Sequence, residues 1–149
     1  MLKLGGYINI LIAIAHLVGL FWAEQMYEVT GIGNEMKKLA QTNFYLPYVL
    51  TITVAILFFI FGLYGLSADN KFRKLPFIKT AIFSIAGIYL FRSFGELILD
   101  NIQDTNSTTE TIYSILALFI GFLFLFGGFR KFQNHKNINQ FNKINNFLI

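Results

Sequence analysis

The chain has 149 residues, of which 55% are hydrophobic and only 13% are charged. A soluble domain usually carries about 25% charged residues, so this composition argues against a soluble globular protein. The absence of cysteine excludes disulfides, thiolate-bound metals and cysteine redox chemistry. The net charge of +4 comes from basic residues that flank apolar segments, so it does not point to nucleic-acid binding.

The apolar residues collect into four long runs separated by polar segments. Each run is long enough to cross a hydrocarbon core of about 30 Å as an α-helix. The first run is longer than the apolar core of a signal peptide, so we expect it to be retained as a span. The sequence therefore predicts one all-α membrane domain over residues 1–129, a four-helix bundle with spans at 4–23, 44–66, 77–99 and 112–129.

The charges in the links predict how the bundle is oriented. Lys71, Arg73 and Lys74 lie between the second and third spans, and the tail over residues 130–149 is also basic. The link between the third and fourth spans holds acidic residues and no Lys or Arg. By the positive-inside rule, both termini are cytoplasmic and the first and third links face outward. We expect a multi-pass protein of a bacterial inner (cytoplasmic) membrane.

Two segments outside the spans leave alternatives open. In the first link, Gly31 and Gly33 precede a stretch from Asn34 onward that is suited to a short helix, which would act either as a lid or as a simple connection. The basic tail would form either a helix lying on the inner membrane surface or a disordered segment. Its apolar residues recur at every third position: Ile138, Phe141, Ile144 and Phe147.

Small residues predict where helices approach each other closely. Ala15 and Gly19 in the first span, and Ala117 and Gly121 in the fourth, are each four residues apart. Such pairs allow close contact between membrane helices. Gly62 and Gly65 lie within an apolar span, so they do not form a phosphate-binding loop.

Three ionisable residues fall inside the predicted spans: His16, Arg92 and Glu96. An ionisable group at mid-bilayer costs roughly 2.5 kcal/mol or more, so it usually faces a partner or a cavity. Counting from the outer ends of the spans places Arg92 and His16 roughly 10–12 Å deep. The third span carries a polar stripe at spacings of three and four residues: Tyr89, Arg92, Ser93, Glu96 and Asp100.

These observations predict an outward-facing polar pocket in the outer half of the bundle. Its expected ligand-binding residues are His16, Tyr48, Thr51, Tyr89, Arg92 and Glu96. Three structural alternatives remain open. Arg92 would extend outward to the lipid phosphates at the membrane interface. Arg92 and Glu96 would form an ion pair that holds spans together, and His16 would be a hydrogen-bonded histidine of the core.

No cofactor or metal is expected. A haem held by two histidines would need a second intramembrane histidine besides His16. A zinc site would have to use His16, Glu24 and Glu96, and the positive charge of Arg92 beside them disfavours a cation. An arginine close to a histidine and tyrosine hydroxyls suits an anionic head group better.

Three functions follow from this pattern. The first is a non-enzymatic protein that binds a lipid-like or amphipathic small molecule in the polar pocket. The second is an accessory subunit, assembly factor or immunity factor of a larger membrane complex, in which the Phe-rich second and fourth spans contact a partner or a second copy. The third is a membrane enzyme acting on a lipid or quinone, with His16 as acid/base and Glu96 as its partner.

Overall fold

The computed structural model describes residues 1–69, 73, 75–103 and 108–145, without the side chains of 97, 99–103, 108–110 and 134–145. These residues form helices and contain no strand. In chain order the helices are α1 (Leu2–Gly19), the short 3₁₀ helix η1 (Leu20–Trp22), α2 (Ala23–Val29), α3 (Gly33–Thr42), α4 (Leu46–Ala68), α5 (Ile78–Gln103) and α6 (Thr108–Asn145).

Three helical segments are long and apolar enough to cross a membrane. In the described part of the chain these are Leu2–Val29, Leu46–Ala68 and Thr111–Gln133. The third predicted span corresponds to α5, which has 26 residues but carries Lys79, Arg92, Glu96 and Asp100, and it is not among these three. The protein is therefore a helical multi-pass membrane protein, as predicted, whereas the fourth crossing remains a prediction.

Large apolar side chains cover much of the helix surfaces. Phe77 and Phe91 are each 84% exposed, and Phe21 is 82% exposed. A soluble monomer rarely leaves extended apolar patches of this kind uncovered. In a bilayer the same side chains contact acyl chains, which explains why these helices need so few partners within the chain.

Local sequence signals explain where the helices of the first link begin and end. Gly31 adopts a φ of +80°, a backbone conformation that favours glycine, and it separates α2 from α3. The Asn43 side chain accepts a hydrogen bond from the Tyr45 backbone N–H just before α4, and Pro47 lies in the first turn of α4. The predicted short helix in this link is confirmed as α3, and α2 adds a helix beyond the predicted end of the first span.

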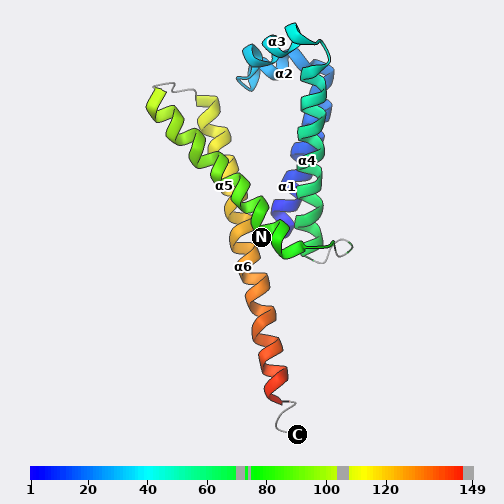
Figure 1. Ribbon diagram of the computed structural model, residues 1–149, viewed down its shortest axis with the longest axis vertical. Coiled ribbons are helices and arrows are strands. Elements are labelled where there is room, and N and C mark those ends of the chain that lie inside the picture. The colour runs from blue at the N-terminus through cyan, green and yellow to red at the C-terminus, as the bar shows by residue number, and fades with distance from the viewer. Residues whose placement is uncertain (70–72, 74, 104–107, 146–149) are drawn as a thin grey trace.

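The long helices form two antiparallel pairs, α1 with α4 and α5 with α6 (Figure 1). The pairs meet near Met1 and the end of α4, where α6 continues past them toward the C-terminus, and they diverge toward the end that holds α2 and α3 (Figure 1). We call these the Met1 end and the cap end. The cap consists of α2 and α3, which lie at the far end of the α1/α4 pair.

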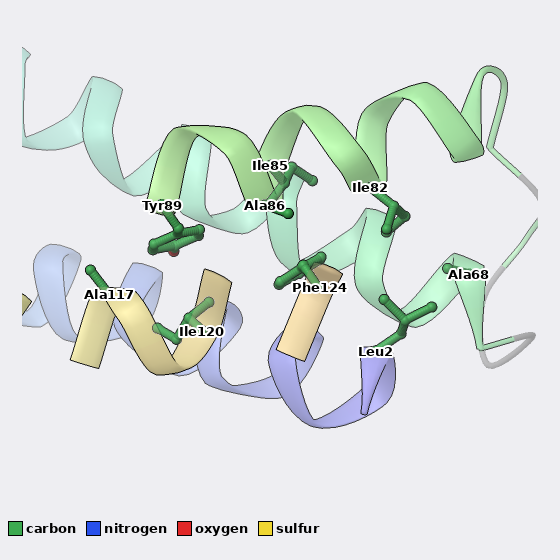
Figure 2. Packing of buried hydrophobic residues seen from close by; sticks show 9 residues of the cluster. All are labelled: Leu2, Ala68, Ile82, Ile85, Ala86, Tyr89, Ala117, Ile120 and Phe124. Atoms are coloured by element: carbon green, nitrogen blue, oxygen red, sulfur yellow. The ribbon is translucent and has the colours of Figure 1, made fainter. Parts of the chain in front are cut away.

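The buried core lies where the two pairs meet. Figure 2 shows that all four long helices contribute to it: Leu2, Ala68, Ile82, Ile85, Ala86, Tyr89, Ala117, Ile120 and Phe124. The Lys131 ammonium also donates a hydrogen bond to the carbonyl oxygen of Ala68, which joins α6 to the end of α4. Contacts between the pairs are therefore concentrated at the Met1 end.

Glycines set the close approach of α1 and α4. A Cβ atom added to Gly65 would lie 2.8 Å from the Cα of Gly6, and one added to Gly6 would lie 2.9 Å from the carbonyl oxygen of Gly62. Both distances are shorter than a normal contact, so the two backbones touch only because these positions lack side chains. The contact of Gly6 with Gly62 and Gly65 was not predicted from the sequence.

The two predicted small-residue pairs have different outcomes. In α6, Ala117 is buried and a Cβ at Gly121 would lie 3.0 Å from Leu90 of α5, so this pair marks a contact between helices. In α1, Ala15 is exposed and Gly19 lies against Met26 of α2. The prediction of a contact between spans at Ala15 and Gly19 is wrong, because the α4-facing side of α1 is defined by Gly6 instead.

The C-terminal segment continues α6 without interruption from the predicted fourth span to Asn145. The side chains of Ile138, Phe141 and Ile144, and the whole of Phe147, lie outside the described part of the chain. The choice between an interfacial helix and a disordered tail therefore remains a prediction.

Candidate functional site

A buried polar pair connects the two helix pairs at the point where they begin to diverge. The Tyr89 hydroxyl of α5 donates a hydrogen bond to the Asn9 side-chain oxygen of α1 over 2.6 Å. The Asn9 amide nitrogen donates in turn to the Gly5 carbonyl oxygen over 2.8 Å. Asn9 is fully buried. This arrangement satisfies both ends of the Asn9 amide in an apolar environment, where an unpaired polar group would be costly.

Sequence reasoning identified Tyr89 and missed Asn9. A usable signal was present, because Asn9 is a polar residue within an apolar run and lies seven residues, about two helical turns, before His16. The two residues therefore share one face of α1. On the first span the prediction considered only the ionisable His16, so the uncharged Asn9 was left out of the predicted site.

The face of α5 that carries Tyr89 is turned toward the α1/α4 pair. The Tyr89 ring lies 6.4 Å from the ring of Phe58 and 6.2 Å from that of Phe61, both on α4. Arg92 and Glu96 follow Tyr89 by three and seven residues, so they share this face. The Arg92 side chain is nevertheless 56% exposed.

Arg92 and Glu96 form an ion pair in which one Arg92 nitrogen lies 2.8 Å from a Glu96 carboxylate oxygen. The second carboxylate oxygen of Glu96 accepts a hydrogen bond of 2.8 Å from the Ser114 hydroxyl of α6. The buried Ser93 hydroxyl donates to the Ser114 carbonyl oxygen over 2.7 Å. Ser114 of α6 thus holds the Glu96 carboxylate by a hydrogen bond, and Glu96 in turn orients the guanidinium of Arg92.

His16 lies on the facing helix. Its Nδ1 lies 2.8 Å from the Ile12 carbonyl oxygen, and because a carbonyl only accepts, Nδ1 carries the proton in this contact. In the neutral imidazole, Nε2 then keeps its lone pair. The imidazole ring lies 5.3 Å from the ring of Phe58, which also contacts Tyr89. Phe58 therefore connects His16 to Tyr89, and no contact between described residues joins His16 directly to Arg92.

Tyr48 and Thr51 are placed at the cap. The Thr51 hydroxyl donates to the Pro47 carbonyl oxygen, so the Tyr27 hydroxyl, 3.0 Å from Thr51 Oγ1, must be the donor of their shared hydrogen bond. Tyr48 lines a small cavity between α2, α3 and the start of α4. The six predicted site residues thus fall into two groups: one between the helix pairs, and Tyr48 with Thr51 at the cap.

An exposed ion pair fastens the cap helices to each other. The Lys37 ammonium of α3 lies 2.5 Å from a carboxylate oxygen of Glu28 on α2. The hydrogen bond and negative charge of Glu28 raise the pKa of Lys37 above its usual value of 10.5. Lys37 therefore stays protonated at neutral pH and loses its positive charge, and with it the ion pair, as the pH rises through that raised pKa.

Two further predictions concern metal binding and Asp100. Among the described residues, no group of three or more His, Asp or Glu side chains lies close enough to hold a metal ion. The side chain of Asp100, predicted for the stripe on the third span, lies outside the described part.

Comparisons with known proteins give no assignment. The chain matches no protein-family model, and no curated protein or solved structure is significantly similar to it.

Proposed function

We propose that α5 is a fourth membrane span and that both termini are cytoplasmic. Basic residues lie near the end of α4, at the Met1 end: Arg73 precedes α5, Lys79 lies in its first turn, and Lys131, next to Arg130 on α6, donates a hydrogen bond to the Ala68 carbonyl oxygen. The cap helices carry Glu24, Glu28 and Glu35 together with Lys37 and Lys38, so positive charge predominates at the Met1 end. Within α5, Arg92 and Glu96 neutralise each other, which reduces the cost of carrying them into a bilayer.

We further propose that the protein is a non-enzymatic binder of a lipid-like or amphipathic molecule with an anionic group. The observation that carries this proposal is the half-exposed Arg92 guanidinium on the face of α5 turned toward α1 and α4. In a bilayer this side chain requires a polar companion beyond Glu96, because contact with acyl chains alone would be costly.

The chemistry of the guanidinium supports an anion as that companion. A guanidinium has five N–H donors in a planar fork that matches carboxylates and phosphates, and the Glu96 contact uses one of its nitrogens. His16 on the facing helix adds Nε2 as a further polar atom, and the Phe58 ring beside it suits the apolar part of the molecule. A phospholipid or fatty-acid head group combines these requirements.

The second candidate is an accessory subunit of a larger membrane complex. On α6, Phe122 and Phe126 are exposed and their rings are stacked 5.6 Å apart. Such a rigid aromatic face suits a partner helix as well as lipid. The enzymatic alternative has weaker support, because the described contacts of Glu96 are to Arg92 and Ser114 and those of His16 are to Ile12 and Phe58.

Native mass spectrometry of gently extracted protein tests these proposals. We expect a bound small molecule in the wild type, an occupancy about tenfold lower in Arg92→Ala, and a smaller loss in Arg92→Lys, which keeps the charge. Arg130→Ala, which removes an exposed cation at the Met1 end, is the matched control and should retain the ligand.

Two other outcomes would contradict ligand binding at Arg92. A stoichiometric protein partner without a small molecule would establish the accessory-subunit function. Protein without any ligand in all samples, with Arg92→Ala less stable to heat than Arg92→Lys, would reduce Arg92 and Glu96 to a structural ion pair.

A further inference from the structure

The cap contains a cavity of about 100 Å³ that is separate from the Arg92 site. It lies between α2, α3 and the first turn of α4. Buried residues form its floor: Tyr27, Gly33 and Pro47. The Tyr27 hydroxyl is already used in the hydrogen bond to Thr51, so Tyr27 offers the cavity its ring rather than its polar group.

Two further aromatic residues complete the lining. Phe44 lies in the turn before α4 and Tyr48 in its first turn, and their ring centroids are 5.6 Å apart at an interplanar angle of 44°. Together with Tyr27, they bring three aromatic rings to a cavity of a few ångströms across. The face of an aromatic ring attracts a cation, and rings that converge on a small cavity form the usual recognition site for methylated ammonium groups.

The charged side chains of the lining give the cavity a negative balance. Glu24 and Glu28 lie one turn apart on α2, and Lys37 faces them from α3. Glu28 is engaged by the Lys37 ammonium, and it also lies against Gly33 at the start of α3, where a helix N-terminus stabilises negative charge. Glu24 forms no ion pair among the described residues, although its negative charge helps to raise the pKa of Lys37 across the cavity. The two carboxylates and the one ammonium give the lining a net charge of −1.

We propose that this cavity binds a small organic ammonium group, with Glu24 as the counter-ion and Tyr27, Phe44 and Tyr48 as the aromatic walls. The volume of about 100 Å³ limits the bound part to a compact head, and the rest of the molecule would lie outside the cavity. An ammonium head of this kind belongs either to a phospholipid of the surrounding membrane or to a free solute. This inference does not depend on the function proposed for Arg92.

A pair of isosteric probes separates the charge from the shape. Choline and its neutral carbon analogue 3,3-dimethylbutanol have the same size, and only choline is positively charged. Full-length protein in nanodiscs of phosphatidylglycerol, which has no ammonium group, would be titrated with each probe. Saturation-transfer NMR of the methyl protons would detect binding. We expect saturable binding of choline and at least about threefold weaker binding of the neutral analogue.

Variants locate the binding site. Glu24→Gln and Tyr48→Leu should each weaken choline binding by at least about threefold, the size of one exposed ionic or cation–π contact. Glu35→Gln removes a carboxylate of α3 that does not line the cavity, and Arg92→Ala alters the other site, so both should bind choline like the wild type. Circular dichroism of each variant checks that the helices are retained.

The lipid composition distinguishes the two sources of the ammonium group. Weaker apparent choline binding in phosphatidylcholine nanodiscs would identify lipid head groups as competing occupants, and unchanged binding would identify a free solute. Equal binding of choline and its neutral analogue, an unchanged affinity in Glu24→Gln, or no saturable binding of choline would each overturn the proposal.

Discussion

At the scale of single residues, Asn9 and Tyr89 form a buried polar contact between the two helix pairs. Both side chains are at least 95% buried, and their hydrogen bond joins α1 to α5. Hydrogen bonds between membrane helices contribute about 0.6–2 kcal/mol, because the unfolded chain also finds partners in the bilayer. The main effect of this hydrogen bond is therefore to determine which faces of α1 and α5 meet, and its contribution to the free energy of folding is small.

Tyr89→Phe should destabilise the protein by about 1 kcal/mol, because it leaves the buried Asn9 oxygen without its donor. Thermal unfolding in detergent, followed by circular dichroism, measures the effect. Tyr7→Phe, on the exposed face of α1, is the control and should be neutral. Adding Asn9→Leu to Tyr89→Phe should cost less than the two single changes together. A strictly additive result would contradict a direct Asn9–Tyr89 interaction.

At the scale of elements, the glycines decide how closely helices pack. Gly6, Gly62 and Gly65 bring the backbones of α1 and α4 into contact, whereas Gly87 on α5 has no atom within 4 Å of an added Cβ. Membrane helices gain little from burying apolar surface, because lipid tails are equally apolar, so this close backbone packing is a main source of their association.

Gly65→Ala should therefore destabilise the α1/α4 pair by about 1–3 kcal/mol, because its Cβ would collide with the Gly6 backbone rather than with a movable side chain. Gly87→Ala should be neutral or slightly stabilising, since alanine is the better helix former and the site is open. The ratio of folded to unfolded protein in increasing amounts of SDS compares the two variants. Equal sensitivity in both would contradict the assigned α1/α4 contact.

At the scale of the whole molecule, two tightly packed helix pairs share a limited contact at the Met1 end (Figure 1). In this arrangement the Arg92 side chain is 56% exposed and that of Glu96 is 33% exposed. The arrangement also separates the cap cavity from the polar residues on α5. The polar residues that were predicted to line a single pocket therefore lie in two separate places, one between the helix pairs and one at the cap.

The absence of native cysteine makes the topology directly testable. A membrane-impermeant maleimide added to intact cells should label Gln41→Cys on α3, and it should leave Asp69→Cys and Gln133→Cys unlabelled until the membrane is permeabilised. The chain between Asp69 and Gln133 contains α5 and the candidate membrane span of α6, Thr111–Gln133. Labelling on opposite sides at these two positions would show that α5 does not cross the membrane.

Sequence alone determined the class of protein, because a bilayer acts on composition and length. Runs of about 20 apolar residues fix membrane helices without regard to what they pack against. The spacing of Arg92 and Glu96 likewise determined their ion pair, since residues four apart on a helix are neighbours by its geometry. The spacing of the small pair Ala117 and Gly121 was also visible in the sequence, although the same spacing at Ala15 and Gly19 marks no contact between spans.

Contacts between helices required the tertiary structure. Equal depth in the bilayer suggested that His16, Tyr48 and Arg92 belong together, but depth does not specify which way each helix is rotated. The rotation was decided by the backbone contact at Gly6 and Gly65 and by the hydrogen bond from Tyr89 to Asn9. The first link shows the same limit, because only its packing against the start of α4 creates the cavity beside Tyr48.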